Sequence, residues 1–303
     1  MARPGSLYLG CVEASPKDWL GGRQFDVDRY LHGATLEETV ATGVYCLVTG
    51  KRRDSNVYFV QSGETWVLVD TAWRGRAALI QSAAETLFGA GARPRAIVLT
   101  HVHPDHAGSA SELARMWDVT VYVHPDELPL PPSGRIIGAL ARVERNWMFP
   151  PGLPGLSPID PDVGVPGLPD WQVIPTPGHT PGHLALFREA DRALIPGDAV
   201  LTVNLNSPGD ALSQRHTLGG PPRFATWNWR AATESVSELA RLEPSVLAPG
   251  HGRPMAGPVL APALRALGEQ LNNPASAGSA GSSAGHKLTE WVLNFFDYSR
   301  RAR

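Results

Sequence analysis

Four potential metal ligands lie within six residues of the chain, in the segment Thr100–Gly108. They are His101, His103, Asp105 and His106, within the sequence THVHPDHAG. Imidazole nitrogens suit zinc, iron, copper and nickel, and a neighbouring carboxylate adds a hard oxygen ligand. Three imidazoles and one carboxylate on a single turn would crowd one ion. We therefore expect them to be shared between two ions.

Three later segments place a histidine or an aspartate in a similar setting. Each segment begins with a short apolar run that is typical of a buried strand, and then continues into a turn rich in glycine and proline. The turns carry His179 and His183 in PTPGHTPGH, Asp198 in IPGD and His251 in APGHG. Because the same pattern recurs, isolated solvent-exposed loop histidines are a poor explanation, and a common site is indicated.

The elements that must position these residues are those of an α/β protein. The apolar residues 96–99 predict a buried strand directly before His101, and a helix is predicted to begin near Ser109. The ligands then occupy a strand-to-helix turn at the end of a sheet, where α/β proteins usually place their chemistry. Further strands are predicted at 44–48, 56–60, 65–70, 119–123, 184–187 and 193–195, and helices at 74–88, 136–145, 230–241 and 259–271.

Composition narrows the class of protein. The chain has 303 residues, of which 43% are hydrophobic, so it can bury a sizeable core. Lys+Arg 27 against Asp+Glu 29 argues against a dedicated nucleic-acid surface. No apolar run approaches the ~20 residues of a membrane helix, and no apolar segment of a signal peptide follows the N-terminus. We expect a cytoplasmic protein that binds neither nucleic acid nor membrane, with Cys11 and Cys46 as buried thiols.

The motifs and their order resemble those of the metallo-β-lactamase superfamily. HxHxDH is followed by GHTxGH, then by GD, then by a strand that ends in GHG, and together they span roughly residues 40–255. Asp70 also matches the aspartate at the end of an early strand in that family. The resemblance implies an α/β fold, a four-layer αββα sandwich of two mixed β-sheets with outer helices, which has its metals at one edge. We expect this domain to cover residues 1–271.

The resemblance also assigns the ligands. It implies two Zn²⁺ ions per chain, with iron or manganese as alternatives, and a hydroxide shared by both ions as the nucleophile. Asp105 would in addition pass a proton to the leaving group. His124 and His183 fall outside the family's ligand pattern, and we expect His183 to be structural or to orient a ligand. The implied ligands are His101, His103 and His179 for the first metal, Asp105, His106 and His251 for the second, and Asp198 as the bridge.

Several functions are compatible with these motifs. Aspartate at 105 and at 198 resembles the glyoxalase II and lactonase-type members, which favours a small ester, thioester or lactone as substrate. The family's β-lactamases often carry a cysteine near the position of Asp198, and this chain has none there. Neither the extra domain nor the basic arm of the nuclease branches is visible, so a phosphodiesterase is also disfavoured. The alternative enzyme is a mononuclear non-haem iron persulfide dioxygenase, which shares the motifs. A non-enzymatic binding domain is disfavoured because the ligand set is complete.

Two loops and the C-terminal segment complete the predictions. Residues 146–170 are rich in proline and glycine and are predicted to be irregular, and Trp147, Met148 and Phe149 would either cover a substrate or anchor the loop. Residues 272–285 read as a flexible linker, and the apolar stripe of 286–303 predicts a helix that docks on its own domain or on a second subunit. Residues 199–229 are also irregular and supply candidates for the substrate wall, namely His216, Phe224, Trp227 and Trp229.

Overall fold

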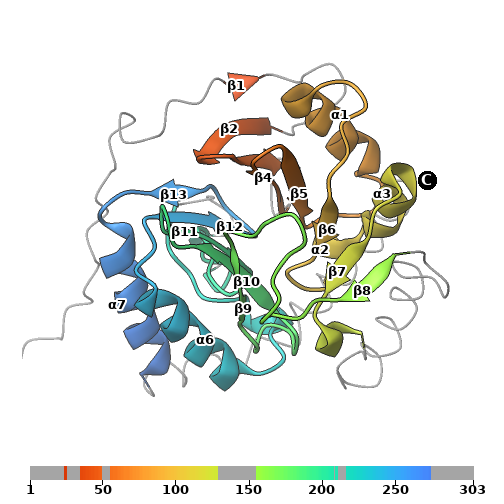
Figure 1. The fold of residues 1–303 in the computed structure, drawn as a ribbon. Helices are drawn as coiled ribbons and strands as arrows, with labels where there is room; N and C mark the ends of the chain where they lie inside the picture. The colour runs from red at the N-terminus through yellow and green to blue at the C-terminus, as the bar shows by residue number, and fades with distance from the viewer. Residues whose placement is uncertain are drawn as a thin grey trace, which may run out of the picture.

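The computed structural model describes residues 24–25, 35–49, 55–128, 155–207, 209–210 and 216–273. Within these residues the chain forms two β-sheets stacked face to face, with helices on both outer sides (Figure 1). This is the four-layer αββα sandwich of two mixed sheets that was expected.

The first sheet has eight strands that follow one another in chain order. The first five form an antiparallel meander, and the last four of the sheet run parallel to one another. Because the parallel strands end at the same edge, the loops that follow them meet there. The strands are β1 (Gln24–Phe25), β2 (Thr35–Ala41), β3 (Val44–Val48), β4 (Asn56–Ser62), β5 (Thr65–Val69), β6 (Ala96–Val98), β7 (Val121–Val123) and β8 (Leu156–Pro158).

The second sheet has five strands in the order β13-β12-β11-β10-β9. β11 and β12 run parallel, and the other neighbours are antiparallel. The parallel pair brings the turns after β11 and β12 to one edge of this sheet. The strands are β9 (Gln172–Pro175), β10 (Leu184–Arg188), β11 (Ala193–Gly197), β12 (Val246–Pro249) and β13 (Met255–Ala256).

Alternation along the strands explains why the sheets stack. In β4, Tyr58 and Val60 face the sandwich interior, whereas Phe59 faces the opposite side. Leu186 and Ile195 of the second sheet meet the first sheet in the same interior cluster. Each sheet is therefore apolar on both faces. One face packs on the other sheet, and the opposite face must be covered by helices.

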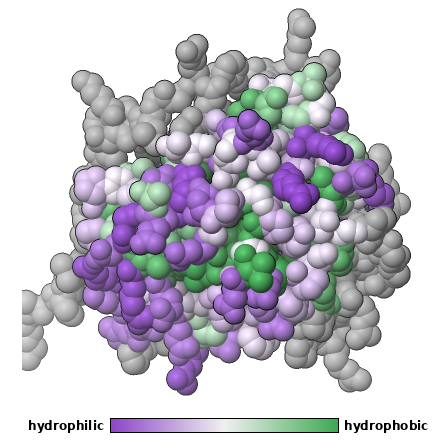
Figure 2. All heavy atoms as spheres, viewed as in Figure 1, coloured by the Kyte–Doolittle hydropathy of each residue, from purple (hydrophilic) through white to green (hydrophobic). Residues whose placement is uncertain are grey.

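The helices supply the outer covers (Figure 1). On the first sheet, α1 (Ala77–Phe88) and α3 (Ala110–Trp117) bury their apolar faces. On the second sheet, α6 (Trp229–Arg241) and α7 (Leu260–Asn272) do the same. The outward side of α6 and α7 is hydrophilic in Figure 2, as expected of amphipathic helices at the surface.

The structure differs from the sequence analysis at two strands, one of which contradicts a prediction while the other was not predicted. Residues 156–158 were predicted to be irregular but form β8, whose ladder is closed by Val121 N–H to Gly155 O and Ile159 N–H to Val123 O. Pro158 is tolerated because an edge strand needs donors on one side only. No strand was predicted at 35–41, where β2 forms. Its register shifts between Glu37 and Ala41, and this irregularity breaks the period-two pattern that would have revealed it.

Some predictions fall outside the described residues. These are the helix at 136–145, the side chains Trp147, Met148 and Phe149, the thiol of Cys11, the linker from residue 274 onward and the docking helix at 286–303. They stay predictions, as do the domain limits and the cytoplasmic location. In the described part of the chain, no helix combines the length and apolar character needed to span a membrane.

Candidate metal centre

The structure brings all seven predicted ligands to one edge of the sandwich. His101 and His103 follow β6, and Asp105 and His106 lie in the short helix α2 (Pro104–Ala107), whose first residue is a proline. The other three come from the second sheet: His179 lies between β9 and β10, Asp198 directly follows β11, and His251 follows β12. The site is therefore made by both sheets together.

Three groups of three ligand atoms lie close together; two of them match the predicted trios, and the third, His101, His106 and Asp198, connects these two. In the first trio, His101, His103 and His179, all ligand atoms lie within 4.8 Å of one another. The same limit holds for the second trio, Asp105, His106 and His251. This division is the one that the family resemblance implied.

Asp198 lies between the two trios. Its Oδ1 is 3.4 Å from His106 Nε2, and its Oδ2 is 3.4 Å from both His179 Nε2 and His251 Nε2. Gly250 makes this approach feasible, because a Cβ there would lie 2.1 Å from Asp198 Oδ1. One carboxylate thus faces ligands of both sets.

Asp70, at the end of β5, orients two of the histidines. Its Oδ1 accepts the backbone N–H of Thr100, and its Oδ2 accepts the Thr100 hydroxyl, both at 2.8 Å. The same Oδ2 lies 2.8 Å from His106 Nδ1, so His106 presents Nε2 to the site. Since Thr100 Oγ1 gives its proton to Asp70, it can only accept from His101 Nδ1 at 3.1 Å. His101 therefore also presents Nε2.

His179 is oriented in the same manner by Thr226. The Thr226 hydroxyl donates to Pro222 O at 2.8 Å, so it accepts from His179 Nδ1 at 3.4 Å. His183 lies within the same loop but serves a different purpose. Its Nε2 accepts the backbone N–H of Asp198 at 3.0 Å, and its Nδ1 faces Thr176 Oγ1 at 2.7 Å. Both ring nitrogens of His183 are occupied, which confirms that it positions a candidate ligand.

The pKa values of the histidines differ between the two trios. Burial, helped by the charges of neighbouring imidazoles, lowers the pKa of His101 well below its ordinary value and lowers that of His103 to about 3. Burial opposes the charge of His106 and His251 as well, but Asp198, Asp70 and Asp105 outweigh it at His106, and Asp198 and Asp105 outweigh it at His251. The pKa of His106 is raised to about 9, and that of His251 is raised well above its ordinary value. Although burial opposes ionisation of Asp105, the charge of His106 and the His251 hydrogen bond lower its pKa to about 2.

The donor set fits divalent metal ions. His179 Nε2 and Asp198 Oδ1 are buried and have no hydrogen-bond partner. The inward-facing atoms of His101 and His179 are lone pairs, because their protons are used outward, and carboxylate oxygens face them. Without metal, the protons of His106 and His251 offset the carboxylate charges; a divalent ion bound to these lone pairs and carboxylates would replace them.

Two positioning residues escaped the sequence analysis. Asn56 Nδ2 donates to Pro249 O and Gly252 O at 2.9 and 2.6 Å, and so holds the turn that carries His251. Glu127, in the turn after β7, accepts N–H groups from both histidine-bearing loops. The only signal for Glu127 was an acidic residue shortly after a strand of the parallel sheet. From the sequence, His124 of the same turn was considered and Glu127 was not. The His124 side chain accepts the backbone N–H of Asp126.

The candidates for a substrate wall lie partly beside the site. The backbone N–H of Trp227 donates to His179 O at 3.1 Å. Trp227 is 50% exposed and Phe224 is 41% exposed. Trp229 instead begins α6 and lies under the guanidinium of Arg223. His216 belongs to neither trio.

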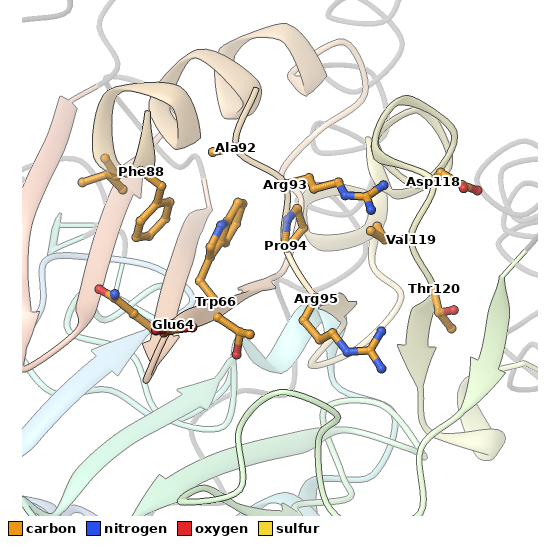
Figure 3. A pocket seen from close by; sticks show the side chains of 13 residues that line it. Glu64, Trp66, Phe88, Ala92, Arg93, Pro94, Arg95, Asp118, Val119 and Thr120 are labelled. Atoms are coloured by element: carbon orange, nitrogen blue, oxygen red, sulfur yellow. The ribbon is translucent and has the colours of Figure 1, made fainter. Parts of the chain in front are cut away.

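A hollow of about 720 Å³ opens at the opposite edge of the first sheet, beside the starts of β5, β6 and β7 (Figure 3). Trp66 and Phe88 stack there with ring centroids 4.8 Å apart, and Arg93 and Arg95 line the other side. Its lining residues include no histidine.

Comparison with known proteins identifies the family. A sequence model described as "Metallo-beta-lactamase superfamily" matches residues 50–251. The chain is 38% identical over 278 residues to the "Probable metallo-hydrolase YflN" of Bacillus subtilis (strain 168), covering 83% of this chain and 95% of that protein. The chain belongs to the metallo-β-lactamase superfamily and is a metal-dependent hydrolase.

Two further similarities are more limited. A "Hydroxyacylglutathione hydrolase" of Xanthomonas axonopodis pv. citri (strain 306) is 32% identical over 143 residues, 46% of each chain. The crystal structure of a metallo beta lactamase from Erythrobacter litoralis matches with a TM-score of 0.54 and 20% identity, covering 78% of this chain and 96% of that one. The structural likeness supports the fold alone.

Proposed function

We propose that this chain is a dinuclear zinc hydrolase that cleaves a small ester, thioester or lactone. The observation that carries the proposal is the position of Asp198, whose two oxygens lie 3.4 Å from ligand atoms of both trios. A single ion bound by the first trio would leave the three ligand atoms of the second trio without a metal to bind. The shared carboxylate supports two ions, held by His101, His103 and His179 on one side and Asp105, His106 and His251 on the other.

When bound, two zinc ions supply Lewis acidity that polarises a substrate oxygen and lowers the pKa of water. The chain's own residues provide the remaining functions. The Asp105 side chain is 16% exposed, compared with 4% for Asp198, so Asp105 lies at the more open part of the cluster. Its Oδ2 faces His251 and His106, which leaves Oδ1 to take the proton that the attacking water gives up and to pass it to the leaving group.

The choice of substrate rests on two observations. Part of the chain is similar to a hydroxyacylglutathione hydrolase, whose name describes thioester chemistry. The second observation concerns the shared ligand position after β11, which is occupied by Asp198 and not by a cysteine. Cys46, the one cysteine among the described residues, lies buried in the sandwich interior. Among the residues that the structure describes, no cysteine therefore lies beside Asp198 as a candidate ligand.

The test is metal analysis of protein produced without added metal, followed by assays on thioesters, lactones, phosphodiesters and β-lactams. About two zinc ions per chain and turnover of a thioester, ester or lactone are expected. One iron per chain with oxygen consumption would instead identify a persulfide dioxygenase and overturn the proposal. Turnover confined to phosphodiesters or β-lactams would overturn the substrate class and leave the metal centre standing.

A further inference from the structure

Glu127 is a buried acid that belongs to neither trio. It ends the single 3₁₀ turn η2 (Pro125–Glu127), which directly follows β7, and it is only 3% exposed. An ionised carboxylate is costly to bury unless hydrogen bonds satisfy it. The neighbouring Asp126 has a 66% exposed side chain, so the turn could have placed its acids in water. The contacts of Glu127 explain why this one is inside.

Each oxygen of Glu127 binds a different loop of the metal centre. Oε2 accepts the backbone N–H of Val102 at 2.9 Å, and Val102 lies between His101 and His103. Oε1 accepts the backbone N–H of Gly182 at 2.7 Å, in the loop that carries His179. The first loop belongs to the eight-stranded sheet and the second to the five-stranded sheet. One carboxylate thus joins the two halves of the first trio.

Gly182 is shaped for this contact. A Cβ at Gly182 would lie 2.9 Å from the backbone nitrogen of Glu127, 3.0 Å from its Cγ and 2.7 Å from His124 Nδ1. Any side chain would push the His179 loop away from the turn. The glycine therefore serves close approach, because its φ is not in the left-handed region. The backbone of the His179 loop therefore packs directly against the turn that contains Glu127.

We propose that Glu127 is a positioning residue that sets the spacing between the His101–His103 loop and the His179 loop, and so the geometry of the first metal site. The inference rests on the proposed function to the extent that the first trio holds a metal. Two members of the second trio have contacts of their own, since Asp70 orients His106 and Asn56 holds the turn of His251. Loss of Glu127 should therefore weaken the first ion more than the second.

Glu127→Gln is the sharpest variant. Glutamine keeps the shape, but it has one acceptor oxygen and one NH₂ group, so either Val102 or Gly182 must face a donor. The matched control is Asp126→Asn, which makes the same chemical change one residue away on an exposed side chain. Glu127→Asp, which keeps the charge but is too short to span both loops, serves as the second variant if Glu127→Gln does not fold.

The measurement is zinc binding by competition with a chromophoric chelator, together with thermal unfolding with and without zinc. For Glu127→Gln, we expect one of the two zinc ions to bind ~10–100-fold more weakly, the usual effect of changing a group that supports a ligand. The zinc-induced rise in unfolding temperature should shrink accordingly. In Asp126→Asn, both affinities should equal those of the unchanged chain.

Three outcomes decide the matter. If the zinc titrations of Glu127→Gln and Asp126→Asn coincide, Glu127 does not position the site, even if the metal-free variant unfolds earlier. If both ions weaken equally, the effect is a general loosening, and the inference is overturned. If the unchanged chain binds no zinc at these residues, the proposed function fails instead. Glu127→Asp is judged by the same comparison.

Discussion

Both trios of the metal centre are rich in histidine, but their histidines differ in protonation when no metal is bound. In the first trio, burial and neighbouring imidazoles lower the pKa values of His101 and His103, so both are neutral at pH 7. In the second, nearby carboxylates raise the pKa values of His106 and His251, so both hold protons when no metal is bound. The first trio is ready for a cation at neutral pH, whereas the second must release protons before it can bind one.

Removing Asp198 should have the largest effect, because its carboxylate faces both trios. We expect Asp198→Ala to lower zinc content at both sites and to abolish most of the zinc-dependent stabilisation, which reaches ~4 kcal/mol at a ligand concentration 1,000-fold above Kd. Metal analysis and thermal unfolding with and without zinc would test this. Glu112→Ala, an exposed carboxylate on α3, is the control. Two tightly bound zinc ions in Asp198→Ala would show that the sites are independent.

Asp105→Asn should reduce turnover while leaving the zinc ion of the first trio bound. The variant keeps the shape and one oxygen, so zinc held by His101, His103 and His179 should remain. Turnover should fall ~10²–10⁴-fold, the usual contribution of general acid–base catalysis. The measurements are zinc per chain and kcat on the identified substrate. Near-native turnover would remove the proton-transfer role of Asp105, whatever the metal content.

Proton release offers a more direct comparison. Zinc loading of both sites at pH 7 should release about two protons, one each from His106 and His251, because only neutral imidazole binds metal. The first trio should contribute none from His101 and His103. Calorimetry in buffers of different ionisation enthalpy counts these protons, and His106→Gln should release about one fewer. Release that is absent at pH 7 would contradict the charge difference between the trios.

The smallest effect concerns the pH dependence of the metal-free chain. The raised pKa values of His106 and His251 stabilise the fold fully below the unfolded pKa of about 6.5, and this contribution is lost as pH rises through about 9 for His106. The lowered pKa values of His101 and His103 act oppositely, since stability is lost as pH falls from 6.5 towards 3.

Metal-free protein should therefore unfold at its highest temperature near pH 6.5, whereas zinc-loaded protein should keep its stability at pH 9, where the ligands are deprotonated. Activity should decline below pH 6.5 as protons compete with the metal. Melting curves between pH 5 and 9, with and without zinc, would show this. If the unfolding temperature of the metal-free protein does not decrease as the pH rises from 6.5 to 9, the raised pKa values of His106 and His251 are contradicted.

The sequence was informative where the chemistry is local. His101, His103, Asp105 and His106 could be identified because one turn carries them all, and each remaining candidate ligand directly follows an apolar run. Glu127 could not be identified, because its two partners lie 25 and 55 positions away and offer only backbone N–H groups, which every residue has. β8 was missed for a related reason: its ladder depends on β7, while its own composition argues for a loop.

The division of the site between two sheets has a consequence for the order of folding and metal insertion. Four candidate ligands lie within residues 101–106, so an unfolded or newly made chain already presents a local metal-binding segment. Any zinc bound there stabilises the unfolded chain too and reduces the net gain from binding the native state. His179, Asp198 and His251 join only when β9 to β12 have stacked on the first sheet. Refolding in excess zinc should thus be slower than refolding followed by zinc addition, with the early-bound ion acting as a kinetic trap.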